Sequence, residues 1–222
     1  MSGHSRFDRT AHRYADEARK RDYSELAGWC LPEAGDRALD VAAGPGFLSA
    51  ALLPQVAWAV AFDESEALLA HAPDGVERVS GDADALPFED GSFDIVTCVH
   101  SLHHVPHPET ALAEMARVLA PGGRMVVQDY LADPDPEQAW EWDEIERLRD
   151  PGHGRLLRRG EVARLVGAYG LAPDDETEWT STWDAGRWIS MAEPDEATAA
   201  RLVELIGSDR FQLVDWRGRF KR

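Results

Sequence analysis

Two glycines and three aspartates stand where short apolar runs of the sequence end. Asp40 precedes the turn that contains Gly44 and Gly46, Asp63 ends the second run, and Asp82 follows the third. Glycines in such a turn allow positive φ angles and a close approach of a ligand to the backbone. An acid at the end of the second strand can bind both ribose hydroxyls of a nucleoside. The pattern therefore predicts a nucleoside cofactor at one edge of a sheet.

Asp40 indicates which kind of nucleoside cofactor fits this turn. A dinucleotide fingerprint would read G-x-G-x-x-G/A, whereas the third small position here is Ser49. The turn also lacks the Gly-Lys-Ser/Thr ending of a nucleotide-triphosphate loop. A carboxylate at the loop entrance would repel a pyrophosphate and attract an ammonium group. A cationic amino-acid nucleoside is therefore the expected ligand.

Short apolar runs alternate with amphipathic stretches up to Tyr130, which is typical of a parallel sheet covered by helices. The run Phe93–Val99 has the continuous apolar character of a central buried strand. Four other strands are expected over Arg37–Val41, Ala57–Phe62, Val76–Ser80 and Arg124–Tyr130. The helices between them are expected over Phe47–Leu53, Ser65–His71 and Pro108–Leu119, the last broken by Pro121-Gly122-Gly123.

Beyond Tyr130 the sequence becomes acidic and rich in tryptophan. We expect a helix directly after that strand, another over Glu161–Tyr169, and two antiparallel strands over Glu176–Thr182 and Phe211–Phe220, separated by a polar helical insert. The chain is expected to be a single domain, residues 1–222. Its parts would be an N-terminal helical lid (1–31), a cofactor-binding core (32–132), and a substrate cap with the final strands (133–222).

Residues 37–130 carry four motifs in order: LDVAAGPG, VAFDESE, GDADALPFEDGSFDIVTC and LAPGGRMVVQDY. With these motifs the sequence resembles the class I S-adenosylmethionine-dependent methyltransferases, and within them the branch of the ubiquinone/menaquinone-biosynthesis C-methyltransferases. The third motif is long and carries most of the resemblance. The resemblance implies a Rossmann-like α/β fold with a seven-stranded, mostly parallel sheet, helices on both faces, an antiparallel last strand and a helical cap.

The same resemblance assigns the cofactor-binding residues. Asp40 and the backbone of the glycine loop would hold the methionyl part of S-adenosylmethionine, Asp63 the ribose, and Asp82 with Ala83 the adenine. The loop that starts at His100 would close over the methionine end. The complete set is Asp40, Ala42, Gly44, Gly46, Asp63, Asp82, Ala83 and His100.

Four histidines follow the central strand: His100, His103, His104 and His107. Their spacing would place them on one face of a helix and invites a metal site. Pro106 and Pro108 disfavour a regular helix there, so we expect no metal. Methyl transfer depends mainly on positioning, and a base is needed only if the acceptor carries a proton. His103 or His104 is the candidate base, although a packing or capping role is equally open.

Composition restricts the partners. The net charge of −18 would repel nucleic acid and anionic membranes. No apolar stretch is long enough to span a bilayer, so no membrane insertion is expected. Cys30 and Cys98 lie among apolar residues, and two buried free thiols suit a cytoplasmic protein. We expect a monomer or homodimer that acts on a small-molecule acceptor.

Three functions compete for this sequence. The first is methyl transfer from S-adenosylmethionine to a C, O or N atom of a small molecule, aromatic or quinone-like. The second is a protein of the same fold that binds the cofactor without methylating anything, since fold alone does not fix function. The third is a nicotinamide-dependent oxidoreductase, which Asp40 and Ser49 disfavour. Trp140, Trp142, Trp183 and Trp188 of the C-terminal half would pack in the core or line the acceptor pocket.

Overall fold

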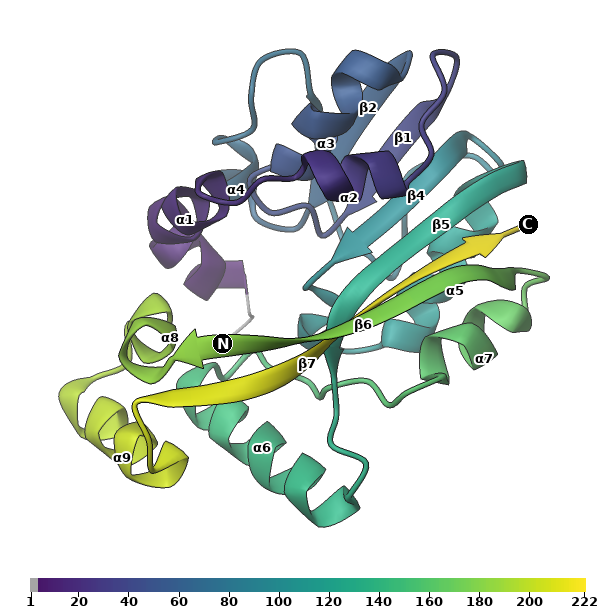
Figure 1. Ribbon diagram of the computed structural model, residues 1–222. Coiled ribbons are helices and arrows are strands. Elements are labelled where there is room, and N and C mark those ends of the chain that lie inside the picture. Colours follow the sequence, from purple (N-terminus) through teal and green to yellow (C-terminus); the bar gives the residue numbers. More distant parts are fainter. Residues whose placement is uncertain (1–3) are drawn as a thin grey trace.

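One sheet organises the part of the chain that the structure describes, residues 4–222 of a computed structural model (Figure 1). Its strands are β1 (Arg37–Val41), β2 (Trp58–Asp63), β3 (Glu77–Ser80), β4 (Phe93–Val99), β5 (Leu119–Leu131), β6 (Ala172–Asp184) and β7 (Arg210–Lys221). They lie in the order β3-β2-β1-β4-β5-β7-β6. β1 to β5 run parallel, and β7 is antiparallel to both of its neighbours. The predicted seven-stranded, mostly parallel sheet is confirmed.

Helices cover both faces of this sheet. They are α1 (His4–Arg19), α2 (Ser24–Trp29), α3 (Phe47–Leu52), α4 (Glu66–Leu69), α5 (Pro108–Val118), α6 (Pro136–Arg149), α7 (Glu161–Gly167), α8 (Ala185–Met191) and α9 (Glu196–Ile206), with short 3₁₀ turns η1 (Leu53–Gln55) and η2 (Leu102–His104). The predicted N-terminal helical region is therefore two helices, and its first three residues lie outside the described part. None of the described helices is long and apolar enough to cross a bilayer.

Alternation along the parallel strands separates two apolar layers. Ala38 of β1 packs with α2 and α3, whereas the next residue, Leu39, packs with α5 and α7. The same division holds in β4, where Ile95 and Val96 belong to opposite layers and both are fully buried. Successive side chains of a strand point to opposite faces, so a strand covered on both sides must be apolar throughout. This is why β4 was predicted with its observed bounds.

The start of β5 differs from the prediction. The strand begins at Leu119 and passes through Pro121-Gly122-Gly123, which were expected to separate a helix from a strand beginning at Arg124. Two glycine features permit this. Gly122 has φ +81°, and a Cβ on Gly123 would lie 2.9 Å from the backbone oxygens of Ala120 and Asp94. The result is an irregularity in the pairing of β4 with β5 rather than a break.

Three of the helices after β5, α6, α8 and α9, gather at one end of the sheet, whereas α7 lies beside α5. Figure 1 shows α8 at the end of β6 and α9 near the start of β7, with α6 below β7 and beside α9. Trp188 of α8 and Leu202 of α9 are buried in a common cluster with partly buried Trp142 of α6. The predicted acidic helix after β5 is α6, and the predicted polar insert is two helices, α8 and α9.

Candidate functional site

The loop between β1 and α3 lies at the carboxyl ends of the parallel strands. Gly44 and Gly46 have φ angles of +55° and +67°, and Ala42 has +53°. A Cβ on Gly46 would lie 2.9 Å from the Cβ of Ala72, so a larger residue would be both strained and crowded. The glycines thus allow the tight turn that the sequence predicted, with the amide of Gly44 turned toward the end of β2.

Asp40 is buried just before this loop. Its carboxylate accepts hydrogen bonds from Thr97 Oγ1 at 2.6 Å and from Ser49 Oγ at 3.4 Å. Burial raises the pKa of Asp40 to about 7, against the lowering effect of the two hydroxyl donors. A cationic ligand beside Asp40 would favour the ionised form of this carboxyl, and the ionised form would in turn attract the ligand.

Asp63 ties the end of β2 to the glycine loop. Its Oδ2 accepts a hydrogen bond from the Gly44 amide at 2.7 Å, and its Oδ1 accepts one from the Ser65 amide at 2.9 Å. Burial raises the pKa of Asp63, and the two amide donors oppose that rise. Ser65 in turn donates to Asp8 of α1 at 2.6 Å. The N-terminal helix is thereby anchored beside the predicted cofactor crevice.

The third acid differs in its surroundings. Asp82 follows β3 and is exposed, and its Oδ1 accepts a hydrogen bond from the Asp84 amide at 2.9 Å. Ala83, the other residue assigned to adenine, is half-buried against the main core cluster. Because β1, β2 and β3 are parallel, their carboxyl ends lie on the same side of the sheet, and Asp40, Asp63 and Asp82 all lie at these ends.

His100 stands at the end of β4 with a positive φ of +52°. Its Nε2 lies 2.8 Å from Nε2 of Gln128 and 3.3 Å from Oδ1 of Asp215, and its ring lies 4.6 Å from that of Tyr130. These contacts place its ring beside β5 and β7. His100 therefore lies between the ends of β1 to β3 and the second half of the sheet.

His103 lies in η2 and is held by Asp129 of β5. Its Nδ1 is 2.5 Å from Asp129 Oδ1, and its backbone amide donates to Asp129 Oδ2 at 3.2 Å. Burial lowers the pKa of His103, but the charge and hydrogen bond of Asp129 outweigh burial, so that the pKa is raised overall. The contact with Asp129 fixes one tautomer of the His103 imidazole and leaves Nε2 available to accept a proton.

The four-histidine stack inferred from spacing does not form, because η2 is only three residues long and the chain then turns at Pro106. His100 packs toward Tyr130, and His107 is exposed. His103 and His104 instead meet His153, which follows α6; each of the three offers a ring nitrogen within 4.8 Å of the others. Sequence reasoning missed His153, because this residue lies in a separate segment and no spacing pattern links it to His103 and His104.

Aromatic side chains continue from the histidines into the C-terminal half. The ring of Tyr130 lies 5.9 Å from His103 and 6.4 Å from Trp183, and Trp142 lies 5.0 Å from Phe211. The indole nitrogens of Trp142 and Trp183 are buried without a hydrogen-bond partner among the described residues. Phe7 of α1 covers His104 with a ring-centroid distance of 5.4 Å. An apolar wall with unused donors therefore adjoins the histidines.

The comparisons with known proteins agree with one another. The family model described as "Methyltransferase domain" matches residues 39–127. The chain is 32% identical over 200 residues to the uncharacterised methyltransferase YcgJ of Bacillus subtilis, which covers 85% of this chain and 79% of that protein. The crystal structure of YcgJ superposes with a TM-score of 0.84 at 26% identity, over 90% of this chain and 97% of that one.

Two further relatives have named acceptors. The demethylmenaquinone methyltransferase of Clavibacter sepedonicus is 46% identical over 167 residues, or 72% of this chain and 66% of that protein. The 27-O-demethylrifamycin SV methyltransferase of Amycolatopsis mediterranei is 31% identical over 218 residues, or 93% of this chain and 78% of that protein.

Proposed function

Because this chain belongs to the S-adenosylmethionine-dependent methyltransferases, we propose that it methylates an aromatic or quinone-like small molecule bound between η2, β5 and the C-terminal cap. The proposal rests on one observation: the predicted cofactor residues and the histidines of η2 lie side by side at the carboxyl ends of the parallel strands. Buried Asp40 and Asp63 frame the glycine loop, and the imidazoles of η2 follow at the end of the adjoining strand β4.

We propose the cofactor roles that the motifs implied. Asp40 and the backbone of Ala42–Gly46 hold the methionyl group, Asp63 the ribose, Asp82 with Ala83 the adenine, and the His100 loop covers the methionine end. The buried carboxyl of Asp40 supports a ligand that carries an ammonium group rather than a pyrophosphate, because its ionised form attracts a cation and repels an anion. S-adenosylmethionine supplies an electrophilic methyl group when bound. The chain's own contribution is then orientation, exclusion of water and, for a protonated acceptor, a base.

We propose His103 as that base and His104 as its neighbour on the acceptor side. Asp129 orients the ring of His103, so that Nε2 is the nitrogen available to the acceptor. His103 is 6% exposed, which keeps bulk water from competing with an acceptor for that nitrogen. Phe7 packs on His104 from α1, and this contact supports the lid role of the N-terminal segment.

We also propose the class of partner, the location and the oligomeric state of the chain. The negative charge of the chain supports a partner other than nucleic acid, and the two buried free cysteines support a cytoplasmic location. We propose a monomer or homodimer, because all groups of the proposed site come from one chain.

Cofactor affinity should rise with pH up to about pH 7 and then level off. The pKa of Asp40 is about 7 in the free protein, so a cationic ligand must displace its proton at lower pH. One coupled proton changes affinity by at most about tenfold per pH unit below that pKa. Calorimetric titration with S-adenosylhomocysteine between about pH 5 and pH 7, below the ordinary pKa of an α-amino group, measures this effect. Asp40→Asn should flatten the profile, and a wild-type affinity that is constant across this range would contradict the assignment.

Asp63→Ala should weaken S-adenosylhomocysteine binding at least about tenfold, because a hydrogen bond to a charged group contributes about 1.5–3 kcal/mol. Asp63 also holds the amides of Gly44 and Ser65, so Asp63→Asn is the companion variant that retains an acceptor oxygen. Asp74→Ala, an exposed acid on the same half of the sheet, is the matched control. Calorimetry on folded proteins gives the affinities, and equal values for all four proteins would remove Asp63 from the ribose site.

Trp183→Leu should reduce or redirect methylation while leaving cofactor affinity within about threefold, since Trp183 packs against Tyr130 and contacts none of the described residues proposed to bind the cofactor. Trp183 faces Tyr130 in the cap, whereas Trp140 of α6 is 62% exposed. Trp140→Leu is therefore the control, and it should behave as wild type. Products are compared by mass spectrometry after incubation with labelled S-adenosylmethionine and cell extract. Unchanged product formation by Trp183→Leu would make this side chain a packing residue.

A further inference from the structure

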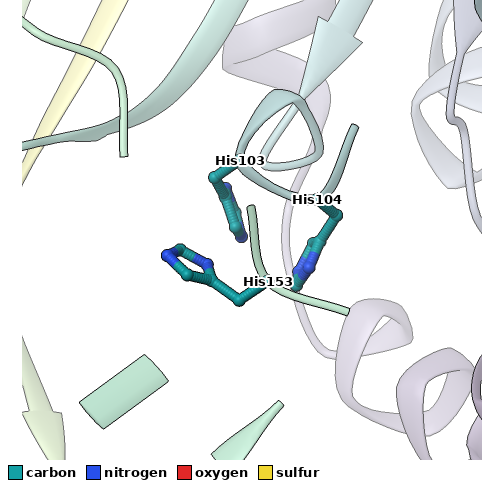
Figure 2. Close-up of side chains that lie close together, drawn as sticks. All are labelled: His103, His104 and His153. Carbon is teal, nitrogen blue, oxygen red and sulfur yellow. The ribbon is translucent and has the colours of Figure 1, made fainter. Parts of the chain in front are cut away.

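We infer that His103, His104 and His153 form a site for a divalent cation of the zinc class, such as Zn²⁺ or Co²⁺. Each of the three offers one ring nitrogen, and these nitrogens lie within 4.8 Å of one another. Figure 2 shows the rings of His103 and His104 below the turn that carries both, with the ring of His153 beside them on a separate segment. Metal binding rests on this geometry alone, and only its catalytic consequence rests on the proposed function.

Carboxylates hold two of the three histidines, His103 and His153, by one ring nitrogen each. Nδ1 of His103 contacts Asp129 at 2.5 Å, and Nε2 of His153 contacts Asp143 at 2.8 Å. Metal-binding histidines usually have such a partner on the nitrogen that does not bind the metal, because it fixes the tautomer and the ring orientation. The opposite nitrogens, Nε2 of His103 and Nδ1 of His153, are then the ligand atoms. Nδ1 of His153 is buried and has no hydrogen-bond partner among the described residues.

The local charge favours a cation. Asp129 and Asp150 are almost fully buried, and Asp150 lies 3.7 Å from Nδ1 of His104. The nearby cation Arg149 is paired with Glu146 at 2.8 Å, which offsets its charge. Imidazole ligands suit zinc, cobalt, nickel and copper, whereas magnesium and calcium prefer oxygen. Three protein ligands also leave a fourth tetrahedral position for water or another ligand.

This site departs from the expectation of no metal, which did not consider His153. That expectation was drawn from the spacing of His100, His103, His104 and His107, and two of these four point elsewhere. The site inferred here gains its third ligand from the segment after α6, which the spacing around η2 could not reveal. Figure 2 shows this segment passing below η2.

A cation bound at this site would prevent His103 from acting as the proposed base. A cation on Nε2 of His103 takes the nitrogen that the proposed base needs for proton removal. The metal-bound and base-competent states therefore exclude each other, and added Zn²⁺ should lower the rate of methyl transfer.

The test is Co²⁺ and Zn²⁺ binding to the full chain after chelator treatment, with excess Mg²⁺ to occupy exposed carboxylates. Wild type should bind one cation per chain, with the visible absorption of tetrahedral cobalt. His153→Ala should lose this binding, and Asp143→Asn should weaken it about 10–100-fold, as outer-shell partners do. His107→Ala, an exposed histidine near η2, is the matched control and should retain it. S-adenosylhomocysteine affinity serves as the folding check for each variant.

Cobalt binding that persists in His153→Ala, or wild type that binds S-adenosylhomocysteine but no cobalt, would overturn the metal site. A wild-type chain that binds cobalt but not S-adenosylhomocysteine would support the metal site and contradict the proposed function.

Discussion

Replacing His103 with asparagine should slow methyl transfer by about 10²–10⁴-fold, the usual contribution of a positioned acid or base. The asparagine amide can still donate to Asp129, which is 2% exposed and would otherwise be left with a buried, unpaired charge. It cannot accept a proton from the acceptor. The rate is measured as the appearance of labelled methyl in the product that wild type forms in cell extract, with metal kept away by a chelator.

His107→Ala is the control for His103→Asn, because His107 belongs to the same loop and is exposed. Both variants should bind S-adenosylhomocysteine as wild type does, since neither residue belongs to the proposed cofactor crevice. A His103→Asn protein with normal affinity and a normal rate would show that this imidazole is a packing group. Loss of cofactor affinity in His103→Asn would instead place it in the cofactor site.

Replacing Arg124 with methionine should lower the free energy of unfolding by about 3–5 kcal/mol, as breaking a buried ion pair does. Arg124 of β5 is 8% exposed, donates to the carbonyl of Cys30 at 2.8 Å, and also donates to the Leu31 carbonyl and to Asp36. It thereby ties the turn between α2 and β1 to the centre of the sheet. The loss should lower the melting temperature by about 2–4 °C per kcal/mol.

An exposed ion pair on α9 serves as the control for the buried pair of Arg124 and Asp36. Arg201 and Glu204 lie 3.0 Å apart on the surface of α9, and Arg201→Met should change stability by less than about 1 kcal/mol. Adding Asp36→Asn to Arg124→Met should cost less than the sum of the two single changes, because the methionine variant leaves Asp36 without its guanidinium partner. Chemical denaturation measures all of these differences. Strict additivity, or equal losses for Arg124→Met and Arg201→Met, would contradict the role given to the buried pair.

The sequence alone predicted the bounds of those strands whose burial follows from a local run of apolar residues. β1 and β4 have the predicted bounds, because each is a short apolar run buried on both faces. β5 was predicted too short, since the pairing tolerates the irregularity that Gly122 and Gly123 introduce. The positions of Asp40 and Asp63 beside the glycine loop also follow from local pattern, because strand ends in a parallel sheet share one edge.

Contacts between distant segments could not be predicted in the same way. His153 joins His103 through a loop that follows α6, and no periodicity links the two segments. The tryptophans illustrate the same limit. Trp140 and Trp142 are neighbours in one acidic helix, yet one is exposed and the other packs against Phe211. Their different surroundings depend on where α6 docks, which composition does not determine.

The most direct test of methyl transfer to a small molecule uses S-adenosylmethionine with an isotopically labelled methyl group. The purified chain is incubated with this cofactor and an extract of small molecules, and the mixture is analysed by mass spectrometry beside the Asp63→Ala protein. We expect a small-molecule product that carries the label, formed by wild type and strongly reduced with the variant. Label that stays on the cofactor under conditions where S-adenosylhomocysteine binds, or that enters only protein or nucleic acid, would contradict the account.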